Sequence, residues 1–170
     1  MTLTALTGPL QGSADDRLAV IVERLDGFLR LDPDLSFQIA AYVGGEPVLD
    51  AWGGPHLSGD SLMVPYSVSK LTIAVSVALL VQRGELDLDA TVAEYWPEFA
   101  QGGKAAVTVR QLLSHQAGLP EADPVLTWDE VLDHHLGEAR LAATVPFWRP
   151  GSAFGYHGIV IGNLADELVF

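Results

Sequence analysis

Ser67 and Lys70 are the first residues in this sequence whose types and spacing could do chemistry, in the segment Ser67-Val-Ser-Lys70. On a helix, positions three apart are neighbours, so the hydroxyl and the amine would share one face. A serine hydroxyl is a weak nucleophile unless a nearby base removes its proton. The free N–H groups at a helix start would also stabilise an oxyanion that forms there. The S-x-x-K pattern therefore predicts a nucleophilic serine with a lysine as its base.

The surroundings of Lys70 favour this chemistry. Ile73, Ala74, Val77 and Val81 follow on the same predicted helix face. An amine packed against apolar side chains loses hydration, which favours its neutral form. Taken alone, the pair also fits an exposed lysine at the start of a packing helix, so other motifs must decide.

Tyr156 is the second candidate. It lies in a turn rich in glycine and aromatic residues, from Trp148 to Gly158, that leads into a helix. Glycines at 151, 155 and 158 would let the backbone approach other groups closely. A phenol presented there could relay a proton to or from Ser67. The alternative is a tyrosine that only packs in the core of a turn.

Other polar groups indicate no cofactor and no metal. His134 and His135 are adjacent on a predicted helix and point in different directions, and no carboxylate stands at a zincin spacing from both. The chain has no cysteine, which excludes disulfides, thiolate catalysis and cysteine-based zinc sites. Gly53-Gly54 has neither a P-loop nor a dinucleotide-binding context.

Periodicity and punctuation predict the elements that must position these residues. Residues 1–12 read as a loose leader, and residues 13–170 as the N-terminal part of one domain. A helix is expected over 14–31, and strands over 36–43 and 48–52 with a hairpin turn at Gly44-Gly45. Further helices are expected over 67–83, 109–114, 127–141 and 159–170, with caps at Thr108, Thr127 and Gly84. Two clear strands are marginal alone, so the chain reads as incomplete.

The amino-acid composition limits the kinds of binding partner that the chain can have. The 22 acidic residues outnumber the nine basic ones, for a net charge of −13, which opposes binding to nucleic acid or to an anionic membrane. The longest apolar stretch, 71–81, is interrupted by Thr72 and Ser76 and is too short to span a bilayer. No signal peptide is recognisable, so a cytoplasmic location is expected. An unpaired sheet edge could promote self-association.

Three motifs occur in order: Pro65-Tyr-Ser67-Val-Ser-Lys70, then Gln111-Leu-Leu-Ser-His115-Gln-Ala-Gly-Leu-Pro120, then Trp148-Arg-Pro-Gly151 with Gly155-Tyr-His157. Together they resemble the serine β-lactamase superfamily, and within it the family VIII carboxylesterases and class C-like hydrolases. The resemblance implies that Ser67 is the acylated nucleophile, Lys70 its base and Tyr156 the second proton carrier. It marks the His115 loop as a structural landmark.

The sequence departs from that family in two places. Class C enzymes usually carry Asn two residues after the tyrosine, whereas Gly158 stands here, with His157 between. Tyr-His-small is typical of the esterase branch, and the missing side-chain amide weakens a β-lactamase interpretation. The family's third motif, a strand of the Lys-Thr-Gly or His-x-Gly type, has no counterpart after Tyr156, and family members are considerably longer.

These observations predict an α/β protein of the α+β type, with an antiparallel sheet flanked by helices, an inserted helical subdomain and C-terminal strands missing. The expected function is a serine hydrolase that cleaves small-molecule esters or amides through an acyl-enzyme on Ser67. The alternatives are a catalytically weak or inactive fragment of such a hydrolase and, less favoured, a true β-lactamase or DD-peptidase.

Overall fold

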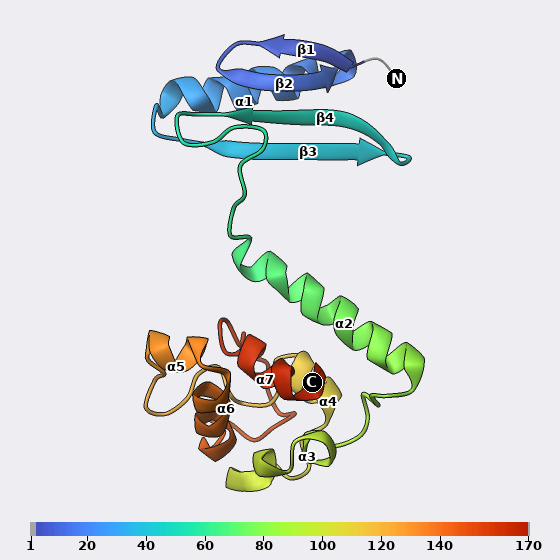
Figure 1. Cartoon of the computed structure of the whole chain (residues 1–170), viewed down its shortest axis with the longest axis vertical. Helices are drawn as coiled ribbons and strands as arrows, with labels where there is room; N and C mark the ends of the chain where they lie inside the picture. Colours follow the sequence, from blue (N-terminus) through green and yellow to red (C-terminus); the bar gives the residue numbers. More distant parts are fainter. Residues whose placement is uncertain (1–2, 170) are drawn as a thin grey trace. The chain divides into compact units, whose positions relative to one another are not determined.

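Four antiparallel strands and one helix make up the first part of the molecule. The computed structural model describes residues 3–169, apart from the side chain of His134. Residues up to Val64 and residues from Pro65 onward form two separate compact units, so each is described by itself. The first contains β1 (Leu3–Thr7), β2 (Leu10–Asp15), α1 (Ala19–Leu31), β3 (Phe37–Val43) and β4 (Glu46–Gly53), with strand order β1-β2-β4-β3 (Figure 1).

The β3–β4 hairpin forms where the sequence predicts it. Gly44 and Gly45 have φ angles of +60° and +86°, the left-handed pair that a tight hairpin turn requires. The sheet buries Leu10, Leu49 and Ala51 against Leu29 of α1. Antiparallel strands with one helix on the sheet confirm the predicted mixed α/β class for this unit.

Residues 3–12 are not the loose leader that the sequence suggests, and this expectation was wrong. They belong to the β1–β2 hairpin, because β2 pairs along its length with β4, which lies about forty residues later in the chain. Gly12 makes that pairing close: it has φ +111°, and a Cβ there would lie 2.1 Å from the Asp50 carbonyl oxygen. The predicted helix start moves accordingly, from residue 14 to Ala19.

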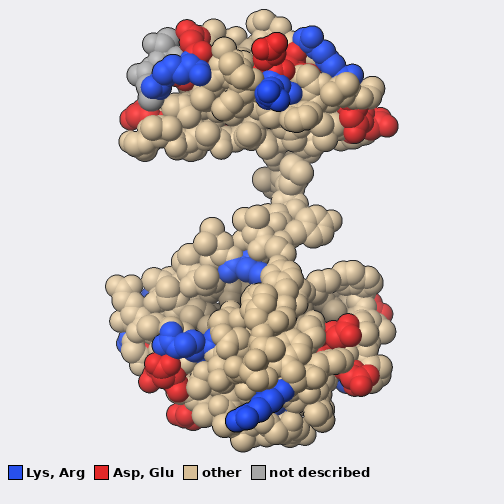
Figure 2. Space-filling view, turned by 180° about the vertical axis from the view of Figure 1, so that it is seen from behind, with Lys and Arg blue, Asp and Glu red and all other residues tan. Residues whose placement is uncertain are grey.

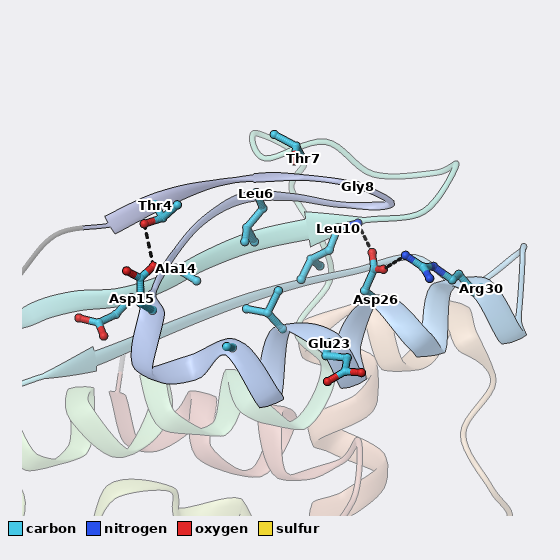
Figure 3. Close-up of a pocket in the computed structure, with 13 residues that line it drawn as sticks. Thr4, Leu6, Thr7, Gly8, Leu10, Ala14, Asp15, Glu23, Asp26 and Arg30 are labelled. Carbon is cyan, nitrogen blue, oxygen red and sulfur yellow. Dashed lines mark hydrogen bonds and ion pairs between the residues drawn. The ribbon is translucent and has the colours of Figure 1, made fainter.

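A cavity of about 530 Å³ lies between α1 and the β1–β2 hairpin (Figure 3). Leu6, Leu10 and Ala14 contribute apolar walls. The Asp26 carboxylate pairs with Arg30 and accepts the Leu10 backbone N–H at 3.1 Å. The Asp26 carboxylate therefore holds the hairpin against α1.

The second unit is helical. Its largest fully buried side chains include Phe99, Leu112, Leu119, Leu141 and Leu164, which form one core. Its elements are a 3₁₀ turn at Tyr66–Ser69, α2 (Lys70–Arg83), α3 (Val92–Tyr95), a 3₁₀ segment at Pro97–Gly103, α4 (Val109–Leu113), α5 (Trp128–Leu132), α6 (His134–Ala143) and α7 (Ile161–Val169) (Figure 1).

Most predicted helix boundaries in this unit are confirmed. Thr108 and Thr127 each form a capping box with the Gln or Glu three residues on, and Gly84 ends α2 in the left-handed conformation. The single helix expected over 127–141 is instead two helices. The break is at Asp133, whose side chain accepts the Leu136 N–H and so starts α6 afresh.

On the face shown in Figure 2, the Lys and Arg side chains lie apart from one another and do not gather into a basic patch. Every helix in the described part of the chain is too short or too polar to cross a bilayer.

The buried carboxyl of Glu138 should make the stability of the protein depend on pH. Burial, followed by hydrogen bonds with Asp166 and Glu167 and by their negative charges, raises the pKa of its carboxyl to about 8. Its Oε1 has no hydrogen-bond partner within the described residues. Between pH 4.5, the ordinary pKa of this group, and about pH 8, the Glu138 carboxyl keeps its proton in the folded chain and has lost it in the unfolded chain. Stability therefore falls as pH rises through this range.

Glu138→Gln should remove this dependence, because an amide keeps the shape without the charge. We expect the variant to be more stable than the wild type by roughly 3–4 kcal/mol at pH 8, and about equally stable at pH 5. Urea unfolding at the two pH values measures the difference. Exposed Glu85→Gln is the matched control, and an equal gain for both variants, or no gain for Glu138→Gln at pH 8, would contradict the assignment.

Candidate active site

A strained turn presents Ser67. Tyr66, the residue before it, has φ +45°, a left-handed conformation that is uncommon for a bulky residue. The 3₁₀ turn Tyr66–Ser69 then runs directly into α2. Ser67 is exposed at the start of this helical segment.

Lys70 lies beside the serine, as the i,i+3 spacing predicts. Its Nζ is 3.4 Å from Ser67 Oγ and donates to it. A mostly apolar cavity of about 410 Å³ adjoins the lysine and is lined by Ile73, Ala74 and Val77 of α2, among others. The lysine stem therefore has hydrocarbon neighbours while its amine contacts the hydroxyl.

Tyr156 completes the cluster from a distant part of the sequence. Its hydroxyl donates to Ser67 Oγ at 2.7 Å, across 89 residues of chain. Lys70 Nζ lies 4.9 Å from the centre of its ring. All three predicted site residues therefore meet in one place within the second unit, and Ser67 Oγ contacts both of the others.

The contacts of Tyr156 change its acidity. The hydrogen bond with Ser67 lowers the pKa of the phenol most, followed by a hydrogen bond with Lys70 and by the lysine's positive charge. Once the phenol has ionised, the Ser67 hydroxyl and the Lys70 amine can donate to its oxygen, and this favours the phenolate over the neutral phenol. A phenolate beside Ser67 Oγ can accept a proton, and a phenol can return it.

His115 and His157 tie the tyrosine loop to the Gln111–Pro120 segment. The His157 backbone N–H donates to His115 Nδ1 at 3.0 Å, and the Leu119 N–H donates to His157 Nε2 at 3.0 Å. His157 is completely buried, and burial lowers the pKa of its imidazole. The sequence shows His157 only as the residue between Tyr156 and Gly158, with no local signal for this cross-link.

No metal centre is found in the described part of the chain, because no group of three or more His, Cys, Asp or Glu side chains there could hold an ion. Of the adjacent histidines noted in the sequence, the side chain of His134 lies outside the described residues.

A family model described as Beta-lactamase matches residues 26–170. The chain belongs to the beta-lactamase family. Among curated proteins, it is 38% identical over 167 residues to the Esterase/beta-lactamase LipL of Mycobacterium tuberculosis, which covers 92% of this chain and 38% of that protein. It is 33% identical over 134 residues to Esterase EstB of Burkholderia gladioli, covering 68% of this chain and 34% of that protein.

Solved structures of this family have the same fold. EstA from Arthrobacter nitroguajacolicus Rue61a superposes with a TM-score of 0.83 at 45% identity, over 99% of this chain and 43% of that one. A family VIII carboxylesterase gives 0.82 at 34% identity, over 94% of this chain and 46% of the other. The predicted β-lactamase-type fold is thus confirmed, and the chain spans less than half the length of these relatives.

Proposed function

We propose that this family member is a serine hydrolase that cleaves esters through an acyl-enzyme on Ser67. The observation that carries the proposal is the convergence on Ser67 Oγ of the Tyr156 hydroxyl at 2.7 Å and the Lys70 amine at 3.4 Å. A hydroxyl held between two proton-transferring groups has the arrangement that an activated serine needs. The relatives named as esterases support the same reaction class.

The reaction follows from these contacts. As Ser67 Oγ bonds to the ester carbonyl carbon, its proton passes to the Lys70–Tyr156 pair. The tetrahedral intermediate collapses when the bond to the alcohol oxygen breaks, and the pair returns the proton to that oxygen. A water molecule then gives its proton to the pair, attacks the acyl carbon, and the carboxylic acid leaves as Ser67 regains its proton.

Esters are favoured over β-lactams because of Gly158. The usual class C residue at that position would hold an amide substrate with its own side-chain amide, and glycine has none. A Cβ at Gly158 would meet only Tyr156 Cε1, at 3.9 Å, so no crowding requires the glycine. Loss of the amide therefore removes a contact to β-lactam substrates without closing the site.

An acylation assay tests the proposal without requiring full turnover. The chain is mixed with p-nitrophenyl acetate, quenched in acid and analysed by intact-mass and peptide mass spectrometry. We expect a burst of one p-nitrophenol per chain and one acetyl group on the peptide that contains Ser67. Ser69→Ala should acylate like the wild type, and a chromogenic cephalosporin should react more slowly than the ester. Absence of an acetyl adduct, or an adduct elsewhere, would overturn the proposal.

A further inference from the structure

Tyr156 needs an outside support to stay beside Ser67. It lies in the loop before α7, outside any helix or strand, and the residue is 51% exposed. A half-exposed side chain on a loop can turn away into solvent, so a restraint on the loop helps to keep its hydroxyl 2.7 Å from Ser67 Oγ.

His115 contacts the loop on both sides of the tyrosine. Its backbone carbonyl accepts the Gly155 N–H at 3.1 Å, and its Nδ1 accepts the His157 N–H at 3.0 Å. Its ring lies 5.1 Å from the Tyr156 ring, centre to centre. The residue before the tyrosine, the residue after it and the phenol ring itself therefore all contact one histidine.

The backbone of His115 is strained in a way that fits this role. Its φ is +62°, a conformation that costs free energy for a residue with a side chain. The conformation turns both the carbonyl and the ring of His115 toward the tyrosine loop. Burial, followed by the positive charge of Lys70, lowers the pKa of the imidazole, which keeps Nδ1 unprotonated and able to accept.

We propose that His115 is a positioning residue that holds the Tyr156 phenol against Ser67 by accepting the His157 N–H. This inference rests on the proposed function, in which Tyr156 carries a proton for Ser67. It assigns a specific task to a histidine that the sequence marks only as part of a structural loop.

Two substitutions at His115 separate the effect of its hydrogen-bond acceptor from the effect of its side-chain volume. His115→Asn places an amide oxygen close to where Nδ1 lies, so it can still accept the His157 N–H, and Asn tolerates a positive φ. His115→Leu fills similar space without an acceptor. Exposed His56, in the other unit, offers a matched control as His56→Leu.

The first readout is the pKa of the Tyr156 phenol, measured by NMR with ¹³Cζ-labelled tyrosine and assigned with Tyr156→Phe. We expect the lowered value of the wild type to persist in His115→Asn and His56→Leu. In His115→Leu it should rise toward that of an ordinary tyrosine, because the phenol no longer stays beside Ser67 and Lys70.

The second readout is the rate at which a fluorophosphonate labels the protein. Displacing a proton-transfer group by about 1 Å costs up to about a hundredfold. We expect labelling to slow roughly tenfold or more in His115→Leu and less than about threefold in His115→Asn. Adding His115→Leu to Tyr156→Phe should cause no further slowing, because the histidine acts through the tyrosine.

The outcomes distinguish this inference from the proposed function. A phenol pKa that stays low in His115→Leu, or that rises equally in folded His115→Asn, overturns the positioning role. If His115→Leu does not fold, His115→Ala, which also lacks an acceptor, takes its place, with the same expected rise in the phenol pKa. A pKa that rises only in His115→Leu, without slower labelling, supports the positioning role and instead contradicts the proton-carrying function of Tyr156.

Discussion

Ser67→Ala is expected to lower ester turnover by about a thousandfold or more, the usual scale for removing a catalytic nucleophile. Lys70 and Tyr156 both contact Ser67 Oγ. Alanine has no oxygen at this position, so neither group has a nucleophile from which to take a proton. The measurement is kcat/KM with a p-nitrophenyl ester.

Ser69→Ala is the matched control for this prediction. Ser69 lies in the same 3₁₀ turn and is also exposed, but its hydroxyl is not part of the Lys70 and Tyr156 contacts. We expect its turnover to stay within about threefold of the wild type, as for a surface substitution away from the reacting atoms. Equal losses in the two variants would show that the turn, and not the Ser67 hydroxyl, is what the reaction requires.

Tyr156→Phe should reduce turnover by roughly a hundredfold or more, the scale for losing a general acid or base. Phenylalanine keeps the ring against His115 and Lys70, so thermal stability should change little. The dependence of the rate on pH tests the role of the phenol more specifically than the rate alone. Below the lowered pKa of Tyr156 the phenol is protonated and cannot accept the serine proton, so wild-type activity should rise with pH through that pKa.

In Tyr156→Phe this dependence should disappear along with the rate. Tyr42→Phe, at an exposed position on β3 in the other unit, should leave both the rate and the pH profile unchanged. If Tyr156→Phe retained full turnover while Lys70→Ala abolished it, proton transfer would run through Lys70 and water, and Tyr156 would be a packing residue.

Local signals predicted the parts of the fold that local contacts stabilise. The capping boxes at Thr108 and Thr127, the Gly44-Gly45 turn and the Gly84 helix end each depend on residues within four positions of one another. The β1–β2 hairpin escaped detection because its stability comes from pairing with β4, and the short alternation in residues 3–15 carries no strong signal alone. Asp133 also reads as an ordinary helix residue until its side chain is seen to cap α6.

In the candidate site, too, the contact between residues close in the sequence was predictable and the contacts between distant residues were not. The Ser67–Lys70 contact follows from helical spacing, so the sequence alone predicted it. For Tyr156 the residues alone left open a proton relay to Ser67 or a packing role. Only the resemblance to a family favoured the first, because nothing local links residues 89 positions apart. The cross-links through His115 and His157 were not anticipated at all, since they pair a backbone N–H with an imidazole from another loop.

A fluorophosphonate tests most directly whether Ser67 is the nucleophile, because it phosphonylates activated serines irreversibly. The labelled protein is digested and the modified residue is located by tandem mass spectrometry. A single adduct on Ser67, absent from Ser67→Ala and retained in Ser69→Ala, is the predicted result. An adduct on Ser69 or Ser61, or labelling that persists in Ser67→Ala, would contradict the assignment.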